Sequence, residues 1–138
     1  MFRKILAAVD LQDPGKSKRV LEVASSLAGA GGEIRLIYVR YMMEAALKYI
    51  DANSLAAEER AVVAELIELA GLAALPADRV SAVSPMGSAA DRILASAAEF
   101  GADVIVIGPH KASAAKYLLG GEATRIVQRA DVSVVVVR

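Results

Sequence analysis

The sequence contains no cysteine and only one histidine among its 138 residues. Without thiols the chain cannot form disulfides or thiolate metal sites, and a single histidine cannot build a histidine-rich metal centre. Aromatic residues make up only 4%, which argues against stacking platforms for nucleic-acid bases. Sixteen basic residues balance sixteen acidic ones, so no net charge attracts a polyanion or a membrane surface. We therefore expect neither a metal site nor a nucleic-acid partner.

Long apolar runs are also missing, although 56% of the residues are hydrophobic. The N-terminal apolar segment, Ile5 to Val9, is too short for a secretory signal, and no run approaches the roughly 18 residues of a membrane-spanning helix. The hydrophobic residues must instead be buried in a core or an interface. A chain of this length is typical of one domain. We expect a single domain over residues 1–138, located in the cytoplasm.

Short apolar runs alternate with amphipathic segments along the chain. Residues 104–107 are four consecutive β-branched residues, which is typical of a central parallel strand that is buried on both faces. The same patterns predict strands at 4–9, 33–39, 79–83, 104–107 and 132–137, and helices at 16–30, 55–75, 89–100 and 122–129. Residues 40–54 have helix-forming composition but a weak apolar stripe and no cap, so they form either a short helix or a mobile cover.

This alternation predicts the fold class. Strands that alternate with helices of this length form right-handed βαβ crossovers, and hence a parallel sheet with helices on both faces. We expect a five-stranded, doubly wound α/β sheet with strand order 3-2-1-4-5. In that order the first and fourth strands are neighbours, which brings Asp10 and Gly108 to the same edge of the sheet.

Glycines and one acid at predicted strand ends indicate a ligand site. Gly120 and Gly121 precede a helix whose first amides have no intrahelical partner, and glycine allows an anion to approach such amides closely. This pair is a candidate phosphate cradle. Asp10 ends the first strand, where its carboxylate could accept a hydrogen bond from a ribose hydroxyl or hold a divalent ion beside phosphates.

Each candidate also has a purely structural interpretation. Asp10 could form an Asx turn or a helix cap, Val39 could be a core residue, and a glycine pair could simply make a turn. His110 and Lys111 could contact phosphate or form an exposed loop. Glu122 suits a helix N-terminus but would repel a phosphate there, so it could instead cap an empty site.

The segment after the fourth strand, GPHKASAAKYLLGGEA, resembles the ligand motif of the universal stress protein family. The resemblance covers nearly the entire chain, from KILAAVD through IRLIYV to TRIVQRADVSVVVVR. In this chain Lys111 stands at the motif's second glycine. Two alignments follow: either the spacer before Gly120 has eight residues and Gly121 takes the place of the motif's Ser or Thr, or the spacer before Gly121 has nine residues and Glu122 takes that place. The family fold is a five-stranded parallel sheet of the adenine nucleotide alpha hydrolase type.

The resemblance implies specific contacts. Adenosine contacts would come from Ala8, Val9, Asp10, Val39, Ile107 and Gly108. Phosphate contacts would come from His110, Lys111, Gly120, Gly121 and Ala123, and Glu122 lies among them as a further site residue. It also implies a homodimer that pairs through the last strand, from Val132 to Val137. Such pairing would cover the open backbone groups of an edge strand.

Two functions follow as hypotheses. The first is a regulatory module that binds ATP, with or without Mg²⁺, between the first and fourth strands, and signals through a homodimer to an unidentified protein partner. The second is a nucleotide-free dimeric interaction protein with a closed crevice. We expect no enzymatic activity, because the chain has no hydrolase triad around His110 and has Ser84 where a phosphoacceptor domain would carry an aspartate.

Overall fold

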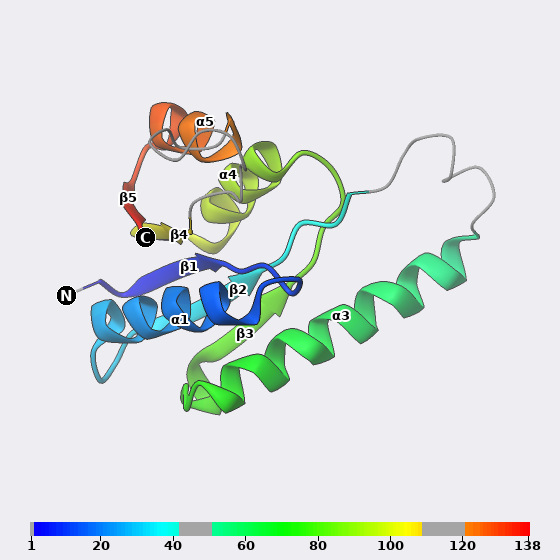
Figure 1. Ribbon diagram of the computed structural model, residues 1–138, viewed down its shortest axis with the longest axis horizontal. Coiled ribbons are helices and arrows are strands. Elements are labelled where there is room, and N and C mark those ends of the chain that lie inside the picture. Colours follow the sequence, from blue (N-terminus) through cyan, green and yellow to red (C-terminus); the bar gives the residue numbers. More distant parts are fainter. Residues whose placement is uncertain (1, 42–50, 109–120) are drawn as a thin grey trace.

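The computed structural model describes residues 2–41, 51–108 and 121–138. Within these ranges five strands form one parallel sheet in the order β3-β2-β1-β4-β5, as predicted (Figure 1). The strands are β1 (Lys4–Ala8), β2 (Glu33–Ile37), β3 (Val80–Val83), β4 (Val104–Ile107) and β5 (Ser133–Val136). Both neighbours of β1, which are β2 and β4, run parallel to it. The chain order therefore reverses between β1 and β4.

Helices cover both faces of this sheet. The described helices are α1 (Pro14–Ala28), α3 (Ala52–Leu72), α4 (Ala89–Phe100) and α5 (Gly121–Arg129), with a 3₁₀ turn, η1 (Ala77–Arg79), before β3. Buried residues of α1 and α3 pack in one apolar cluster, and those of α4 and α5 pack in another. Each cluster lies against its own face of the sheet. In the part of the chain that the structure describes, no helix is long and apolar enough to cross a membrane.

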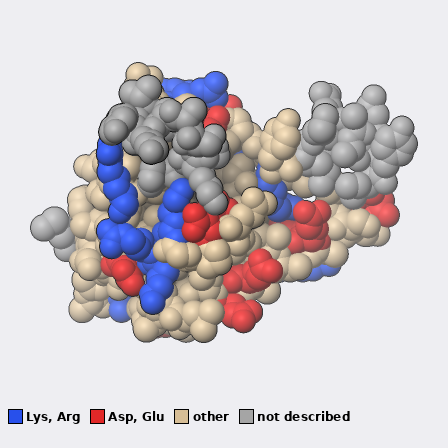
Figure 2. All heavy atoms as spheres, viewed as in Figure 1, with Lys and Arg blue, Asp and Glu red and all other residues tan. Residues whose placement is uncertain are grey.

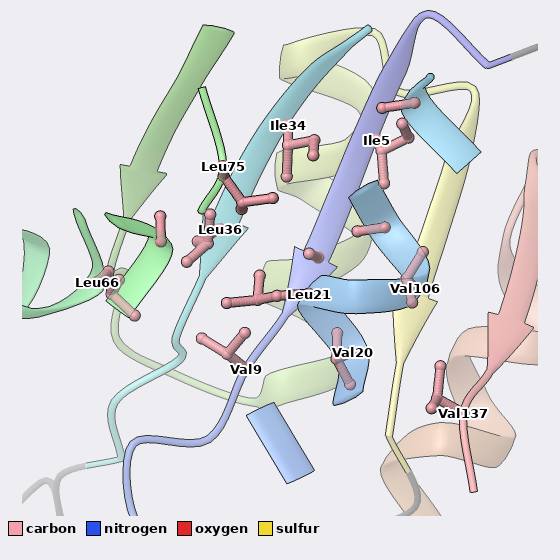
Figure 3. Close-up of a cluster of buried hydrophobic side chains, with 14 of the residues drawn as sticks. Ile5, Val9, Val20, Leu21, Ile34, Leu36, Leu66, Leu75, Val106 and Val137 are labelled. Atoms are coloured by element: carbon pink, nitrogen blue, oxygen red, sulfur yellow. The ribbon is translucent and has the colours of Figure 1, made fainter. Parts of the chain in front are cut away.

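The central strands contribute side chains alternately to the two clusters. On β4, Val104 and Val106 belong to the cluster under α1 and α3, whereas Ile105 and Ile107 belong to the cluster under α4 and α5. Figure 3 shows Val106 together with Val20 and Leu21 of α1 in the first of these clusters. All four residues of β4 are buried, as expected for a central strand whose side chains point in alternate directions into two apolar layers.

The first residues of α1 and α3 differ from the sequence-based ones because aspartates cap these two helices. α1 begins at Pro14 rather than residue 16, since the Asp13 carboxylate accepts a hydrogen bond from the Lys16 amide at 3.1 Å. It ends at Ala28, before the predicted residue 30. α3 likewise begins at Ala52 rather than residue 55, with Asp51 accepting from the Ser54 amide at 2.7 Å. The helix predicted up to residue 75 ends at Leu72, and η1 was not predicted.

The segment after β2, predicted as a short helix or a mobile cover over 40–54, is described only at its ends. Arg40 pairs with Met86 in an isolated parallel bridge, and its guanidinium Nε donates to the Ser84 carbonyl at 3.0 Å. Residues 52–54 belong to α3, and 42–50 lie outside the described residues. The side chain of Arg40 is buried and joins the carboxyl end of β3 to the chain leaving β2.

Candidate functional site

A cavity of about 540 Å³ opens where the strand order reverses, at the carboxyl ends of β1 and β4. Eight of the twelve predicted site residues line it: Ala8, Val9, Asp10, Val39, Ile107, Gly108, Glu122 and Ala123. Gly121 is the first residue of α5 but is not part of the cavity wall. His110, Lys111 and Gly120 lie outside the described residues. The topology therefore brings strand ends that are far apart in sequence to one concave place.

Asp10 lines this cavity and is held there by hydrogen bonds to the start of α1. Its amide donates to Ser17 Oγ at 2.9 Å, and the same hydroxyl donates to the Asp10 carbonyl at 2.7 Å. Oδ1 of Asp10 accepts the Gln12 amide at 2.9 Å, which confirms the Asx turn. Asp10 thus forms the Asx turn and lines the cavity at the same time. A carboxylate has about four acceptor positions, so one backbone hydrogen bond does not exhaust its capacity.

One side of the cavity is apolar. Ile93 of α4 and Ile126 of α5 face it together with Ala8, Val39 and Ile107 from the ends of three strands. Val39, Ala8 and Ile107 also pack against the cluster under α4 and α5. Val39 therefore lies both at the rim of the core and in the cavity wall.

Two tyrosines near Val39 line the cavity, and sequence reasoning missed both. Burial, the main cause, and the nearby carboxylates of Asp10 and Glu65 raise the pKa of the Tyr38 phenol. Tyr38 is therefore neutral near pH 7 and can donate a hydrogen bond. Tyr41 is 81% exposed, which is unusual for a large aromatic side chain at a cavity rim. Both tyrosines lie near the carboxyl end of β2, and this position was the available signal that they could line a ligand site.

Lys16 and Ser17, in the first turn of α1, also line the cavity and were not predicted as site residues. The Lys16 side chain runs across Gly108 at the end of β4, where an added Cβ would lie 2.9 Å from Lys16 Cδ. A Cβ at position 108 would therefore displace the flexible stem of Lys16. In the sequence Lys16 follows a loop whose path cannot be predicted. No local pattern therefore indicates that Lys16 lies next to Gly108.

Glu122 is bonded to the N-terminus of α4. Its Oε2 accepts a hydrogen bond from the Ala90 amide and lies 3.4 Å from Ser88 Oγ. Ser88 is the N-cap residue of α4 but makes no side-chain capping bond of its own. Glu122 Oε1 also pairs with Arg125 at 3.3 Å. A carboxylate from α5 thus caps α4 across the wall of the cavity.

No group of three or more His, Cys, Asp or Glu residues in the described ranges is arranged to hold a metal ion. Among the described residues that line the cavity, the charged ones are the cation Lys16 and the carboxylates Asp10 and Glu122, and Ser17 and the tyrosines add hydroxyls. Such a cavity can exchange hydrogen bonds with the polar groups of a ligand, while the apolar part of that ligand packs against the isoleucines.

Comparisons with known proteins agree with this architecture. The family model for the universal stress protein family matches residues 1–138. The chain is 28% identical to universal stress protein G of Shigella flexneri over 148 aligned positions that cover both chains completely. A crystal structure of a universal stress protein in complex with cAMP has a TM-score of 0.69 at 20% identity, covering 99% of this chain and 97% of that one.

A second solved structure has the same fold. It is the universal stress protein from Archaeoglobus fulgidus in complex with dAMP, with a TM-score of 0.67 at 16% identity over 100% of this chain and 98% of that chain. At these identities the structural likeness establishes the shared five-stranded fold, and the family model establishes the relationship. With the sheet order, the crevice and the full-length match in agreement, this chain belongs to the universal stress protein family.

Proposed function

We propose that this protein is a regulatory module that binds an adenine nucleotide, ATP in the first place, in the crevice between β1 and β4. The observation that carries the proposal is the 540 Å³ cavity at the point where strand order reverses. That volume lies within the range of about 300–1,000 Å³ that is typical of small-molecule sites. The related proteins solved with cAMP and dAMP support an adenine nucleotide as the class of ligand.

The cavity residues suggest how the nucleoside would bind. The adenine ring would lie against Val39, Ile107 and the neighbouring isoleucines, where its flat apolar faces lose contact with water. The carboxylate of Asp10 would accept a hydrogen bond from a ribose hydroxyl. A charge-assisted hydrogen bond of this kind contributes about 1.5–3 kcal/mol.

The phosphates would extend toward the beginning of α5. Gly121 starts this nine-residue helix, so the amides of its first turn lack intrahelical acceptors and carry partial positive charge. The family resemblance adds His110, Lys111 and Gly120 as phosphate contacts, and Mg²⁺ would arrive with the phosphates. We further propose that the protein acts by binding rather than by hydrolysis, as a cytoplasmic homodimer that pairs through Val132 to Val137.

The proposal is tested by thermal unfolding in the presence of ATP and Mg²⁺. A ligand that binds only the folded state stabilises it by about 2.7 kcal/mol at a hundredfold excess over Kd, so Tm should rise with ATP concentration. Asp10→Ala should abolish this rise. Asp78→Ala, which removes an exposed acid in η1, is the matched control and should leave it intact.

A wild-type protein whose Tm is unchanged at millimolar ATP would refute nucleotide binding. The second candidate function, a nucleotide-free dimeric interaction protein, would then be favoured. One observation supports it already, because Glu122 puts a negative charge in the cavity wall at the position next to the expected phosphates. Mass spectrometry of small molecules released from the denatured, purified protein separates the two functions, since only the first predicts a bound adenine nucleotide.

A further inference from the structure

The side chain of Lys16 is placed at the cavity by two independent contacts. Its backbone amide donates to the N-cap residue Asp13, which sets Lys16 in the first turn of α1. Its aliphatic stem lies against Gly108, where a Cβ added to the glycine would meet Lys16 Cδ at 2.9 Å and Cγ at 3.1 Å. Any larger residue at 108 would push this stem aside. The chain thus carries a lysine across the end of β4 at the mouth of the cavity.

Charge is distributed unevenly around the cavity. Among the described residues that line it, Lys16 is the one cation, while Asp10 and Glu122 are anions. Glu122 belongs to α5 and is bonded to the first turn of α4, whereas Lys16 belongs to α1 on the other face of the sheet. An anionic group in the cavity would be repelled by the carboxylates of Glu122 and Asp10 and attracted by the ammonium group of Lys16.

The N-terminus of α4 offers no competing anion site, because the carboxylate of Glu122 already accepts the Ala90 amide there. The first turn of α1 is likewise capped, by the Asp13 carboxylate, so the ammonium group of Lys16 rather than this helix terminus would attract an anion there. Figure 2 shows Lys and Arg side chains forming a band over α1 and near the C-terminus. This band would attract an anion toward the same side.

We propose that Lys16 is a phosphate-binding residue of this protein, whose side chain reaches across Gly108 to the phosphate group of its ligand. This assignment rests on the proposed function and names a contact from α1, outside the segment after β4 to which the resemblance assigns phosphate binding. The contact is a charge-assisted hydrogen bond from the ammonium Nζ to a phosphate oxygen. It compensates for the acidic side chain of Glu122 at the start of α5.

The test is a calorimetric titration of ATP, AMP and adenosine into three proteins: wild type, Lys16→Gln and Lys18→Gln. Lys18 is an exposed lysine of the same helix that does not line the cavity, so its variant is a matched control for loss of one positive charge. Lys16→Gln should bind ATP and AMP about tenfold more weakly and adenosine as the wild type does. Lys18→Gln should bind all three within about twofold of wild type.

The outcomes separate this assignment from the function on which it rests. If the wild type binds adenosine and ATP, but Lys16→Gln retains full affinity for ATP, the assignment alone is wrong. If both lysine variants lose the same affinity for ATP, the assignment is also wrong, because the general positive field of α1 rather than a direct contact from Lys16 would then be responsible. If the wild type binds none of the three compounds, the proposed function and the role of Lys16 fail together. Urea unfolding of each variant verifies that it is folded.

Discussion

At the scale of single residues, Asp103 ties the first strand to the fourth. Its Oδ2 accepts hydrogen bonds from the amides of Arg3 at 2.8 Å and Lys4 at 3.0 Å, so one exposed carboxylate binds the entry of β1 beside the entry of β4. These backbone hydrogen bonds, that from Lys4 foremost, lower the pKa of Asp103 below its ordinary value because they stabilise the charged form.

This lowered pKa predicts an acid-dependent loss of stability. In the unfolded chain an aspartate titrates near 3.9, so below about pH 5 the unfolded state begins to bind a proton that the folded state still excludes. The contribution of Asp103 is therefore complete above that range and is lost as pH falls through the lower folded pKa. Urea unfolding of Asp103→Asn as a function of pH should show a shallower decline than wild type. A decline as steep as that of wild type would contradict the prediction, and Asp78→Asn serves as the exposed control.

At the scale of elements, Glu122 joins α5 to α4 through the Ala90 amide. α4 ends conventionally at Gly101, a glycine with φ 72°, but its N-cap Ser88 makes no side-chain capping bond. The acceptor that satisfies its first turn comes from another helix. The two helices and the cavity wall they share are therefore coupled through one carboxylate.

Removal of this carboxylate should destabilise the protein. Glu122→Ala leaves the Ala90 amide without its acceptor, and loss of a cap costs about 0.5–2 kcal/mol. Glu122→Gln keeps a neutral acceptor for the Ala90 amide, so its free energy of unfolding should fall by less. The measurement is the urea midpoint at unchanged m value. Glu68→Ala, an exposed acid of α3, should change stability by no more than about 0.5 kcal/mol. An equal effect of Glu122→Ala and Glu68→Ala would show that the cap is unimportant.

At the scale of the whole molecule, the sheet ends on one side at β5, which pairs with β4 alone among the described strands. The amide of Val137 donates to the Ile107 carbonyl at 2.7 Å, so amides of alternate residues, including Val134, point away from β4. These outward amides are the groups that a second copy would pair with in the proposed homodimer.

This geometry allows a selective test of the dimer. Val134→Pro removes one outward amide and no hydrogen bond to β4, whereas Val134→Ala shortens the side chain and keeps the amide. Light scattering coupled to size-exclusion chromatography should show a dimer for wild type and Val134→Ala and a monomer for Val134→Pro. Circular dichroism checks that the proline variant is folded. A folded Val134→Pro that stays dimeric would place the interface elsewhere.

Much of the fold, and the position of Asp10 and Gly108 at one edge of the sheet, follow from local pattern. Residues 104–107 could be assigned to a central strand because β-branched residues without a polar face have no other place in a small domain. Once the elements alternate, the handedness of βαβ crossovers restricts the order of the sheet. The positions of Asp10 and Gly108 at the same edge follow from that order, and the cavity contains both.

The contacts that refine this picture join segments distant in sequence. One such contact is that of the Lys16 stem with Gly108, and another is the hydrogen bond from the Ala90 amide to the Glu122 carboxylate, 32 residues away. No periodic pattern in the sequence predicts either contact. Amino-acid patterning by itself determined the five strands, the four described helices to within a few residues and the layered sheet, because burial along short stretches indicates each element and the handedness of the crossovers restricts their order. Only the tertiary structure decided that Lys16 faces the crevice and that Glu122 caps α4, because both depend on how separate elements pack against one another.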